Sequence, residues 1–200
     1  MIHFVLGWRP QGGIELEASA GALSAVTERL GFLEPARLAR WTASDARAAL
    51  AWVAHEPERT GGVRHVCAEP GRLGLFAGRP IRWGPDGVVD GRGPLDPSFY
   101  LRPFRTFCDE LDGRWMGARY DAAQGELELA TDALGAYPVF VAKHGGARWF
   151  SNNATVLATL TGADELDPLA LAGLLGGGWS PAGDPLWRAV RRLPRGGGLR

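Results

Sequence analysis

The stretch 127–151, LELATDALGAYPVFVAKHGGARWFS, decides the fold of this chain. Leu127 and Leu129 alternate with glutamates, and this period of two predicts a half-buried strand. The TDALGAYP segment that follows predicts a tight connection, because Asp, Gly and Pro favour turns. The apolar run 139–142 predicts a buried strand, and Gly145-Gly146 predicts a hairpin turn into a third strand. Strands joined this closely predict antiparallel sheet structure.

Outside this stretch the sequence predicts further strands, with helices inserted among them. The predicted strands span residues 2–8, 14–18, 38–41, 63–68, 74–83 and 115–120. The predicted helices span residues 21–30, 99–111 and 152–160, together with one that starts at Thr42 or Ser44 and ends at Pro57 and one capped by Asp167. Residues 84–97 and 179–200 are predicted to be irregular. This order favours an α+β fold with two antiparallel sheets covered by helices over a doubly wound parallel sheet.

The composition excludes several classes of protein. The 22 basic and 22 acidic residues cancel, so no overall field attracts nucleic acid or an anionic membrane. No apolar run approaches the roughly 20 residues of a membrane-spanning helix, and the N-terminus has no signal-peptide pattern. We therefore expect a cytoplasmic protein. Cys67 and Cys108 lack the spacing of metal ligands, so we expect no metal site and no disulfide framework.

Five short motifs from residue 111 onward follow the order of one family. LDGRW (111–115) resembles that family's L-N/D-G-x-F strand opening, and ATDALGAYPV (130–139) resembles its A-R-D-x-x-G-x-x-P-L turn. WFSNN (149–153), LDPLAL (166–171) and DPLWRAVRRLP (184–194) resemble its F-A-S-E, L-D-P-E-A-L and T-L-F-K-G-V-R-R-L-P-P-G segments. The ordered set resembles the N-terminal, class II glutamine amidotransferase domain of the asparagine synthetase family.

The resemblance implies a fold, a reaction and a nucleophile. The fold is a four-layer αββα sandwich of the N-terminal-nucleophile (Ntn) hydrolase type. The reaction is glutamine hydrolysis, which supplies ammonia to an ATP-using synthetase domain. The family's nucleophile is a cysteine directly after the initiator methionine, and its own α-amine can act as the base. In this chain the nucleophile position is Ile2, which has no nucleophilic atom and before which removal of the methionine is not expected. We therefore predict no catalytic residue and no glutaminase activity.

The glutamine pocket implied by the resemblance is also altered. The family's Asn-Gly-Glu corresponds here to Ala77-Gly78-Arg79. Gly78 keeps a backbone N–H for an oxyanion, whereas Arg79 reverses the charge expected to hold the α-amino group of glutamine. The family's Arg-Leu-Ser-Ile strand corresponds to residues 64–67. We expect Arg64, Gly78 and Arg79 to mark a degenerate glutamine pocket.

Other chemically capable side chains have ordinary alternatives. Cys67 and Cys108 are candidates for a relocated nucleophile, but we favour ordinary buried cysteines, since cysteine is among the most buried residue types. His3 is a candidate base, and we favour packing on a strand. Asp132 is a candidate pocket carboxylate, and we favour a turn in which the side chain accepts from nearby backbone N–H groups. For Arg191-Arg192 we favour packing at a domain border over phosphate binding.

These expectations define two segments and a role. Residues 1–160 are predicted to form the amidotransferase-like sandwich. Residues 161–200 are predicted to form a helix and linker leading toward an ATP-dependent synthetase domain that the sequence does not include, as in a truncation or a split subunit. The parent protein is predicted to be an asparagine synthase-like, amide-forming ligase. β-Lactam synthetases and lasso-peptide cyclases lack the cysteine too, so natural-product biosynthesis is implied beside asparagine biosynthesis, and the predicted role is a scaffold for the synthetase half.

Cofactors and partners follow from that role. We expect no cofactor in this chain, and ATP and magnesium only in the synthetase domain. The expected partner is a synthetase domain or subunit, with a peptide or small carboxylate substrate and a homodimer as further candidates. Two alternatives stay open: a stand-alone, non-enzymatic module that binds a partner, and a residual glutamine hydrolase with a relocated nucleophile.

Overall fold

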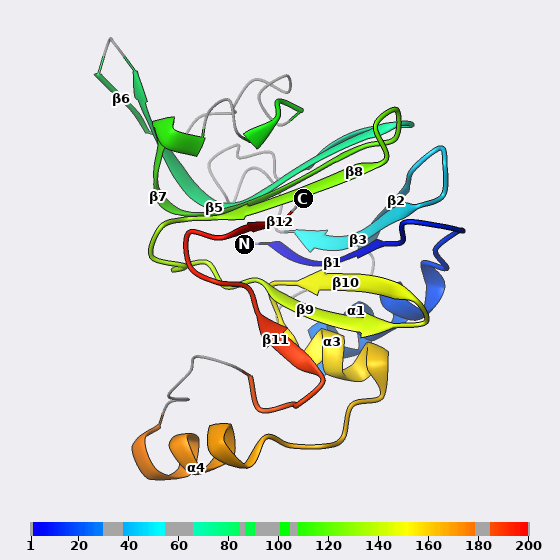
Figure 1. Cartoon of the computed structure of the whole chain (residues 1–200), viewed down its shortest axis with the longest axis vertical. Helices are drawn as coiled ribbons and strands as arrows, with labels where there is room; N and C mark the ends of the chain where they lie inside the picture. Colours follow the sequence, from blue (N-terminus) through cyan, green and yellow to red (C-terminus); the bar gives the residue numbers. More distant parts are fainter. Residues whose placement is uncertain are drawn as a thin grey trace.

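Two antiparallel sheets lie face to face (Figure 1). The structure, a computed structural model, describes residues 2–29, 38–54, 66–84, 87–90, 101–104, 108–178 and 185–199. The first sheet has the strand order β11-β9-β10-β1-β3-β2. Its strands are β1 (Ile2–Trp8), β2 (Leu38–Thr42), β3 (Ala48–Ala54), β9 (Phe140–His144), β10 (Ala147–Ser151) and β11 (Val190–Arg192).

The second sheet is built on one long strand pair. It has the order β12-β8-β7-β5-β4, with β6 paired to the far end of β5. Its strands are β4 (Val66–Glu69), β5 (Arg72–Gly84), β6 (Gly87–Asp90), β7 (Leu111–Asp121), β8 (Glu126–Thr131) and β12 (Gly198–Leu199). β5 and β7 stay in register from the Arg72–Asp121 pair to the Arg82–Leu111 pair. This long pairing gives the second sheet two continuous faces.

The main core fills the space between the sheets. Alternation along β5 turns Leu73, Leu75 and Ala77 inward, where they meet the inward side chains of β1. The β1 contributors are Ile2, Phe4 and Leu6, and all three are fully buried. Burial of each such side chain contributes on the order of 1.5–3 kcal/mol to stability, so this layer holds the sheets together.

Two helices cover the other face of the first sheet. They are α1 (Glu17–Arg29) and α3 (Ala154–Thr161), and they pack against each other and against β1 and β10. Asn153 caps α3 by accepting from the backbone N–H of Thr155, and Gly162 ends the helix in the left-handed conformation. The strands at 2–8, 38–41 and 115–120, those of the 127–151 stretch, and the helix at 152–160 are thus confirmed.

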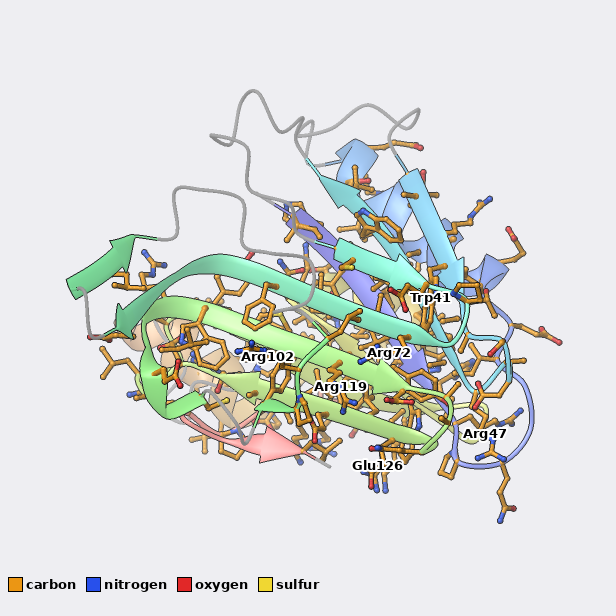
Figure 2. The ribbon with its side chains drawn as sticks, turned by 90° about the horizontal axis from the view of Figure 1, so that it is seen from above. Trp41, Arg47, Arg72, Arg102, Arg119 and Glu126 are labelled. Carbon is orange, nitrogen blue, oxygen red and sulfur yellow. The ribbon has the colours of Figure 1, made fainter. Side chains whose placement is uncertain are left out.

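The outer face of the second sheet carries a different cover. Within the described residues it consists of the segment 101–104 and the 3-10 helix η4 (Cys108–Glu110). Phe104 packs there against Phe76 and Trp115 (Figure 2 views this face from above). The helix predicted over 99–111 is therefore a 3-10 turn at its described end, while residues 99–100 and 105–107 lie outside the described residues.

Two predicted elements are wrong, and a third is wrong in part. The segment predicted as a helix up to Pro57 contains β3, which lies between β1 and β2 in the first sheet and is buried on both faces. Such a strand shows no polar alternation, so its alanines and leucines resemble a helix. The strand predicted at 14–18 is instead the entry to α1, where the Ala20 N–H donates to the Leu16 carbonyl at 2.9 Å. Part of the loop predicted at 84–97 is the strand β6.

The tail predicted as irregular joins both sheets. β11 pairs with β9 in the first sheet, and β12 pairs with β8 in the second. Between them the Leu193 N–H donates to the Val139 carbonyl at 2.8 Å, and the Gly196 N–H donates to the Asp132 carbonyl at 3.0 Å. Residues 190–199 therefore belong to the sandwich as packed here, while the division of the chain at residue 160 stays a prediction.

The last helix, α4 (Pro168–Gly177), stands apart from the sandwich (Figure 1). Asp167 caps it as predicted, accepting from the backbone N–H groups of Leu169 and Ala170, with Pro168 at the first helical position. Ala170 is its only buried residue.

Candidate functional site

The start of β1, where the resemblance places a nucleophile, is held by Asn152. Its Nδ2 donates to the Ile2 carbonyl at 2.8 Å, and its Oδ1 accepts from the Phe4 N–H at 3.3 Å. Ser151 Oγ donates to the Phe4 carbonyl at 2.6 Å. The side chain of Ile2 is fully buried in the core between the sheets. The side chain at this position is therefore a packed hydrocarbon, and its backbone is held by a hydrogen bond from Asn152.

Tyr137 extends the contacts of Asn152. Asn152 Nδ2 also donates to the Tyr137 hydroxyl oxygen at 3.3 Å. Burial raises the pKa of Tyr137, although the Asn152 hydrogen bond and the charge of Arg114 act in the opposite direction. The phenol therefore stays protonated at neutral pH. This pair was not predicted, since an Asn at a helix entry is usually a cap. His3 lies half-buried on β1, paired with Val53, and the predicted packing role of this side chain, favoured over a role as a base, stays a prediction.

Asp132 organises the turn between β8 and β9. Its Oδ1 accepts from the backbone N–H groups of Leu134 at 3.1 Å and Ala136 at 3.0 Å. Its Oδ2 accepts from those of Tyr137 at 3.1 Å and Trp115 at 3.4 Å. The carboxylate is buried and its lone pairs are occupied by the protein's own backbone. The turn interpretation is confirmed, and Asp132 is not a pocket carboxylate.

Gly78 has a structural reason to be glycine. It pairs with Trp115 and has a φ of +95°, which side chains other than glycine rarely adopt. A Cβ there would lie 2.1 Å from the Arg114 carbonyl oxygen. Its role as an oxyanion donor stays a prediction. Arg79 follows on β5 with a side chain outside the described part of the chain, and Arg64 lies outside it altogether.

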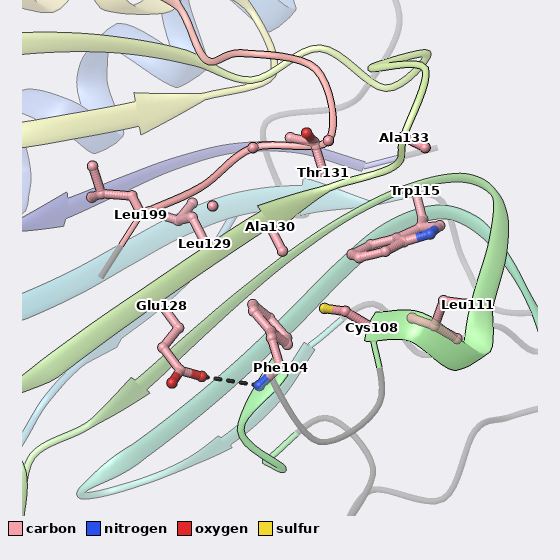
Figure 3. A pocket seen from close by; sticks show the side chains of 13 residues that line it. Phe104, Cys108, Leu111, Trp115, Glu128, Leu129, Ala130, Thr131, Ala133 and Leu199 are labelled. Atoms are coloured by element: carbon pink, nitrogen blue, oxygen red, sulfur yellow. Dashed lines mark hydrogen bonds between the residues drawn. The ribbon is translucent and has the colours of Figure 1, made fainter.

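The two cysteines lie on the far side of the second sheet from Ile2. Both Cys67 and Cys108 pack against the outer aromatic cluster of Phe76, Phe104 and Trp115, whereas Ile2 lies in the core between the sheets. Figure 3 shows the Cys108 thiol directed toward the space between Phe104 and Trp115. Neither thiol therefore takes the place of the family's nucleophile at the start of β1.

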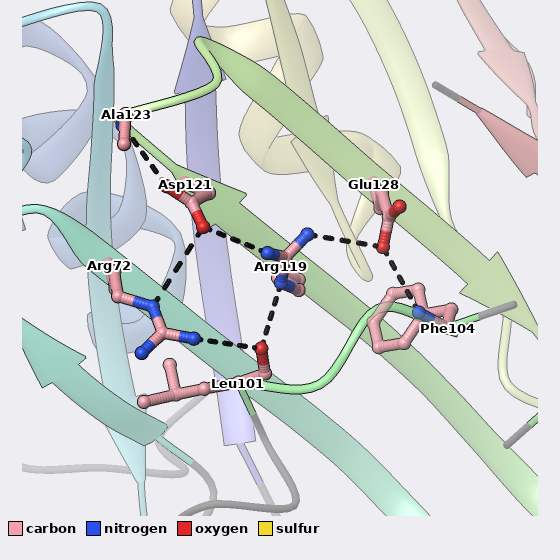
Figure 4. Close-up of polar contacts among 7 residues, drawn as sticks. All are labelled: Arg72, Leu101, Phe104, Arg119, Asp121, Ala123 and Glu128. Atoms are coloured by element: carbon pink, nitrogen blue, oxygen red, sulfur yellow. Dashed lines mark hydrogen bonds and ion pairs between the residues drawn. The ribbon is translucent and has the colours of Figure 1, made fainter. Parts of the chain in front are cut away.

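A buried polar cluster on this outer face was not predicted. Arg119 on β7 is 3% exposed; its Nη2 donates to Asp121 Oδ2 at 2.9 Å, and its Nη1 lies 3.5 Å from Glu128 Oε2 (Figure 4). Arg119 Nε and Arg72 Nη2 both donate to the Leu101 carbonyl, at 2.9 and 3.3 Å.

This polar cluster fastens the cover to the sheet. The Phe104 N–H donates to Glu128 Oε2 at 3.0 Å, so both ends of the segment 101–104 are held by side chains of the second sheet. Two guanidinium groups face two carboxylates, which leaves the cluster without net charge. The alternation of Glu128 with Leu127 and Leu129 shows which face of the strand it is on, but not what covers that face.

Two cavities lie beside residues of this polar cluster. The first, the outer-face cavity, has a volume of about 460 Å³ and lies between the aromatic cluster and residues 196–199 (Figure 3). The second, of about 540 Å³, lies at the tips of the strands beside Asp45, Arg72 and Asp121. Ile2 lines neither. Within the described ranges no three His, Cys, Asp or Glu side chains could hold a metal ion together.

Arg191 and Arg192 lie on β11. Arg192 Nη2 donates to the Gly135 carbonyl at 2.6 Å, which ties β11 to the Asp132 turn. Arg191 is exposed opposite Val141. Arg192 thus has a packing contact within the sandwich, and the predicted packing of this pair at a domain border stays a prediction.

Comparison with known proteins supports the fold. No protein-family model matches the chain. No curated protein matches it either. Among solved structures it is similar to the allosteric regulatory enzyme of purine biosynthesis, with a TM-score of 0.50 and 11% identity over 78% of this chain. It also aligns with glutamine phosphoribosylpyrophosphate amidotransferase from B. subtilis complexed with ADP and GMP, with a TM-score of 0.49 and 10% identity over 78% of the chain.

These likenesses concern architecture. In each case the aligned part spans 43% of the neighbour's own length. The predicted fold class, an α+β sandwich of two antiparallel sheets resembling Ntn hydrolases, is confirmed. Within the described residues no helix is long and apolar enough to cross a membrane.

Proposed function

We propose that this chain is a glutaminase-inactive, amidotransferase-like module of an asparagine-synthetase-like, ATP-dependent amide ligase. Its role is to support the synthetase half. ATP and magnesium belong to that half in this proposal, as does the peptide or small carboxylate substrate. The motif order of residues 111–194 is what points to this family.

The observation that carries the inactive part of the proposal is Ile2. A class II glutaminase needs a thiolate at the start of the first strand, and here that position holds a fully buried hydrocarbon. Asn152 anchors the Ile2 carbonyl, so the backbone there is already committed to a structural contact. A synthetase that takes its amine from within its own substrate needs no free ammonia, which removes the requirement for a glutaminase.

The observation that favours a docking role is α4. Its sequence, PLALAGLLGG, contains no charged residue, and Leu169, Leu174 and Leu175 are 65%, 42% and 78% exposed. Leu166, just before the helix, is 42% exposed. Such a concentration of exposed leucines marks a surface that another apolar surface covers.

The size of α4 favours a synthetase over a second copy of this chain. A helix of ten residues is about 15 Å long. Two such helices bury far less than the roughly 1,200–2,000 Å² of a stable interface, so α4 alone does not hold a homodimer together. It suits one part of a larger interface, or a contact with a domain to which it is covalently linked.

The test is binding to the ATP-dependent synthetase encoded in the same reading frame or next to it, measured by sedimentation velocity. The double variant Leu169→Glu/Leu175→Glu places charges on the α4 surface, and we expect it to lose the complex. Leu134→Glu is the matched control, because Leu134 is 77% exposed in the turn between β8 and β9. Equal binding by the double variant and the wild type would contradict the docking role.

The exposed leucines of α4 also support one alternative, a stand-alone module that binds a different partner through α4. A Ser-Gly-Gly-x-Asp-Ser loop downstream in the reading frame supports the ligase. A partner without that loop that binds through the same leucines supports the stand-alone module.

A further inference from the structure

The outer-face cavity is far from Ile2 and has no part in the proposed function. It opens on the face of the second sheet that is turned away from the first sheet (Figure 3). Its volume of about 460 Å³ lies within the range of small-molecule sites, roughly 300–1,000 Å³.

Small residues line up across three strands: Ala130 and Gly198 line the cavity, and Gly117 makes room for the Phe104 ring beside it. Gly198 of β12 pairs with Ala130 of β8, and Ala130 pairs with Gly117 of β7, so the three share one face of the sheet. Phe104 stands over Gly117, where an added Cβ would lie 2.7 Å from its ring. Beside it, Trp115 supplies a second aromatic wall. The sheet thus forms a floor with almost no side chains, between aromatic walls.

The walls are held in place without a ligand. The Phe104 backbone is fixed by Glu128, and its ring packs edge-on against Phe76, with centroids 5.7 Å apart and an interplanar angle of 81°. The Trp115 ring lies 5.9 Å from the same Phe76 ring, and the Trp115 backbone is tied to Asp132. A site formed in advance does not have to be ordered when its ligand binds, which favours affinity.

The lining selects an uncharged ligand with a hydrogen-bond donor. Glu128 lines the cavity and is 8% exposed, but Arg119 balances its charge. Its contacts to Phe104 and Arg119 both use Oε2. Within the described part of the chain, Glu128 Oε1 makes neither of these two contacts. It can therefore accept a hydrogen bond from a ligand. A flat apolar ring suits the aromatic walls, since ring pairs prefer offset or edge-on contact.

We propose that the outer-face cavity binds a small, uncharged aromatic group that carries an N–H or O–H donor, such as an indole. The ring lies between Phe104 and Trp115, and its donor bonds to Glu128. The group comes either from a free compound or from the side chain of a peptide, since both present the same chemistry.

The two cysteines provide the measurement. Both pack against the aromatic cluster and are partly exposed, but only Cys108 lines the cavity. We expect indole to slow alkylation of Cys108 by iodoacetamide several-fold and to leave Cys67 unchanged, as followed by peptide mass spectrometry on the full chain. 1-Methylindole, which lacks the donor, should protect Cys108 less. Stronger protection by N-acetyltryptophanamide than by indole indicates a peptide side chain, and weaker protection a free compound.

A filled cavity is the negative control. Ala130→Leu places a larger side chain on the floor, and Ala133→Phe, at an exposed position that also lines the cavity, tests the same point without disturbing the sheet. Both should abolish the protection by indole. The proposal is wrong if indole fails to protect Cys108 in the wild-type chain, if it protects Cys67 equally, if 1-methylindole is as effective, or if both filled variants remain protected.

Discussion

At the scale of the residue, Asp132 and Gly78 each determine the local backbone structure around them. Asp132 accepts from four backbone N–H groups of two neighbouring segments, and Gly78 has a backbone conformation that other residues rarely adopt. Sequence reasoning identified both. It assigned Asp132 the correct structural role, because an Asp followed by Gly and Pro favours this turn. It assigned Gly78 a chemical role, because the strand register that requires a glycine is invisible without the partner strand.

Replacing Asp132 should destabilise the fold strongly. Asp132→Ala leaves its backbone donors without an acceptor, and each buried unsatisfied donor costs about 1–3 kcal/mol. We expect a loss of at least about 3 kcal/mol for the alanine, and a smaller loss for Asp132→Asn, which keeps one oxygen. Urea denaturation measures both. Asp164→Ala, at an exposed position, is the control, and the assignment fails if Asp132→Ala unfolds at the same urea concentration as that control.

Two glycines make a matched pair. Gly78→Ala places a Cβ on a residue with a strained φ and against the Arg114 carbonyl oxygen. We therefore expect the free energy of unfolding to fall by about 1–3 kcal/mol or more. Gly21 lies inside α1 with open space where a Cβ would point, so Gly21→Ala should stabilise the chain by roughly 0.5–1 kcal/mol. Thermal unfolding of the two variants should therefore shift in opposite directions. A shift in the same direction would contradict this reading of Gly78.

At the scale of the element, the pattern of polar and apolar residues along a strand decided whether it could be predicted, since β8 alternates and β3 does not. β7 and β8 alternate, and both were predicted. β3 is buried on both faces, and its sequence AALAWVA, without polar alternation, resembles a helix. The polar cluster around Arg119 was missed for a related reason: its charges follow the alternation of a solvated face, and only the cover formed by residues 101–104 buries them.

The cap of α4 should make that helix sensitive to acid. The Ala170 N–H, followed by the Leu169 N–H and the charges of Arg188 and Arg191, lowers the pKa of Asp167, with desolvation acting in the opposite direction. A lowered folded-state pKa stabilises the helix above the ordinary carboxyl value of about 3.9, and this contribution is lost as the pH falls through the folded-state value.

The measurement is the helical ¹³Cα shift of α4 as the pH is lowered from neutrality to below the carboxyl range. The shifts of α4 should decline, while α3, capped by the uncharged Asn153, serves as an internal reference. Asp167→Asn keeps a good cap that does not titrate, so its α4 should persist. Loss of α4 at the same pH in wild type and variant would show that the cap is not the cause.

At the scale of the whole molecule, the sequence predicted the architecture better than the site. The order of strands and helices along the chain was enough to predict two antiparallel sheets, but it did not predict the route of the tail. β11 and β12 are short and paired to opposite sheets, so local pattern carries no sign of them. The predicted site residues are divided between Ile2 in the first sheet and Gly78 and Arg79 in the second, with Arg64 outside the described residues.

The central claim is that this sandwich no longer hydrolyses glutamine. The direct measurement is glutamate release from glutamine by the purified chain, together with mass-shift labelling by an electrophilic glutamine analogue. We predict no glutamate above the rate without protein and no labelled cysteine, since Cys67 and Cys108 lie across the second sheet from Ile2. Turnover in the wild-type chain that is lost in Cys67→Ala or Cys108→Ala would contradict the claim.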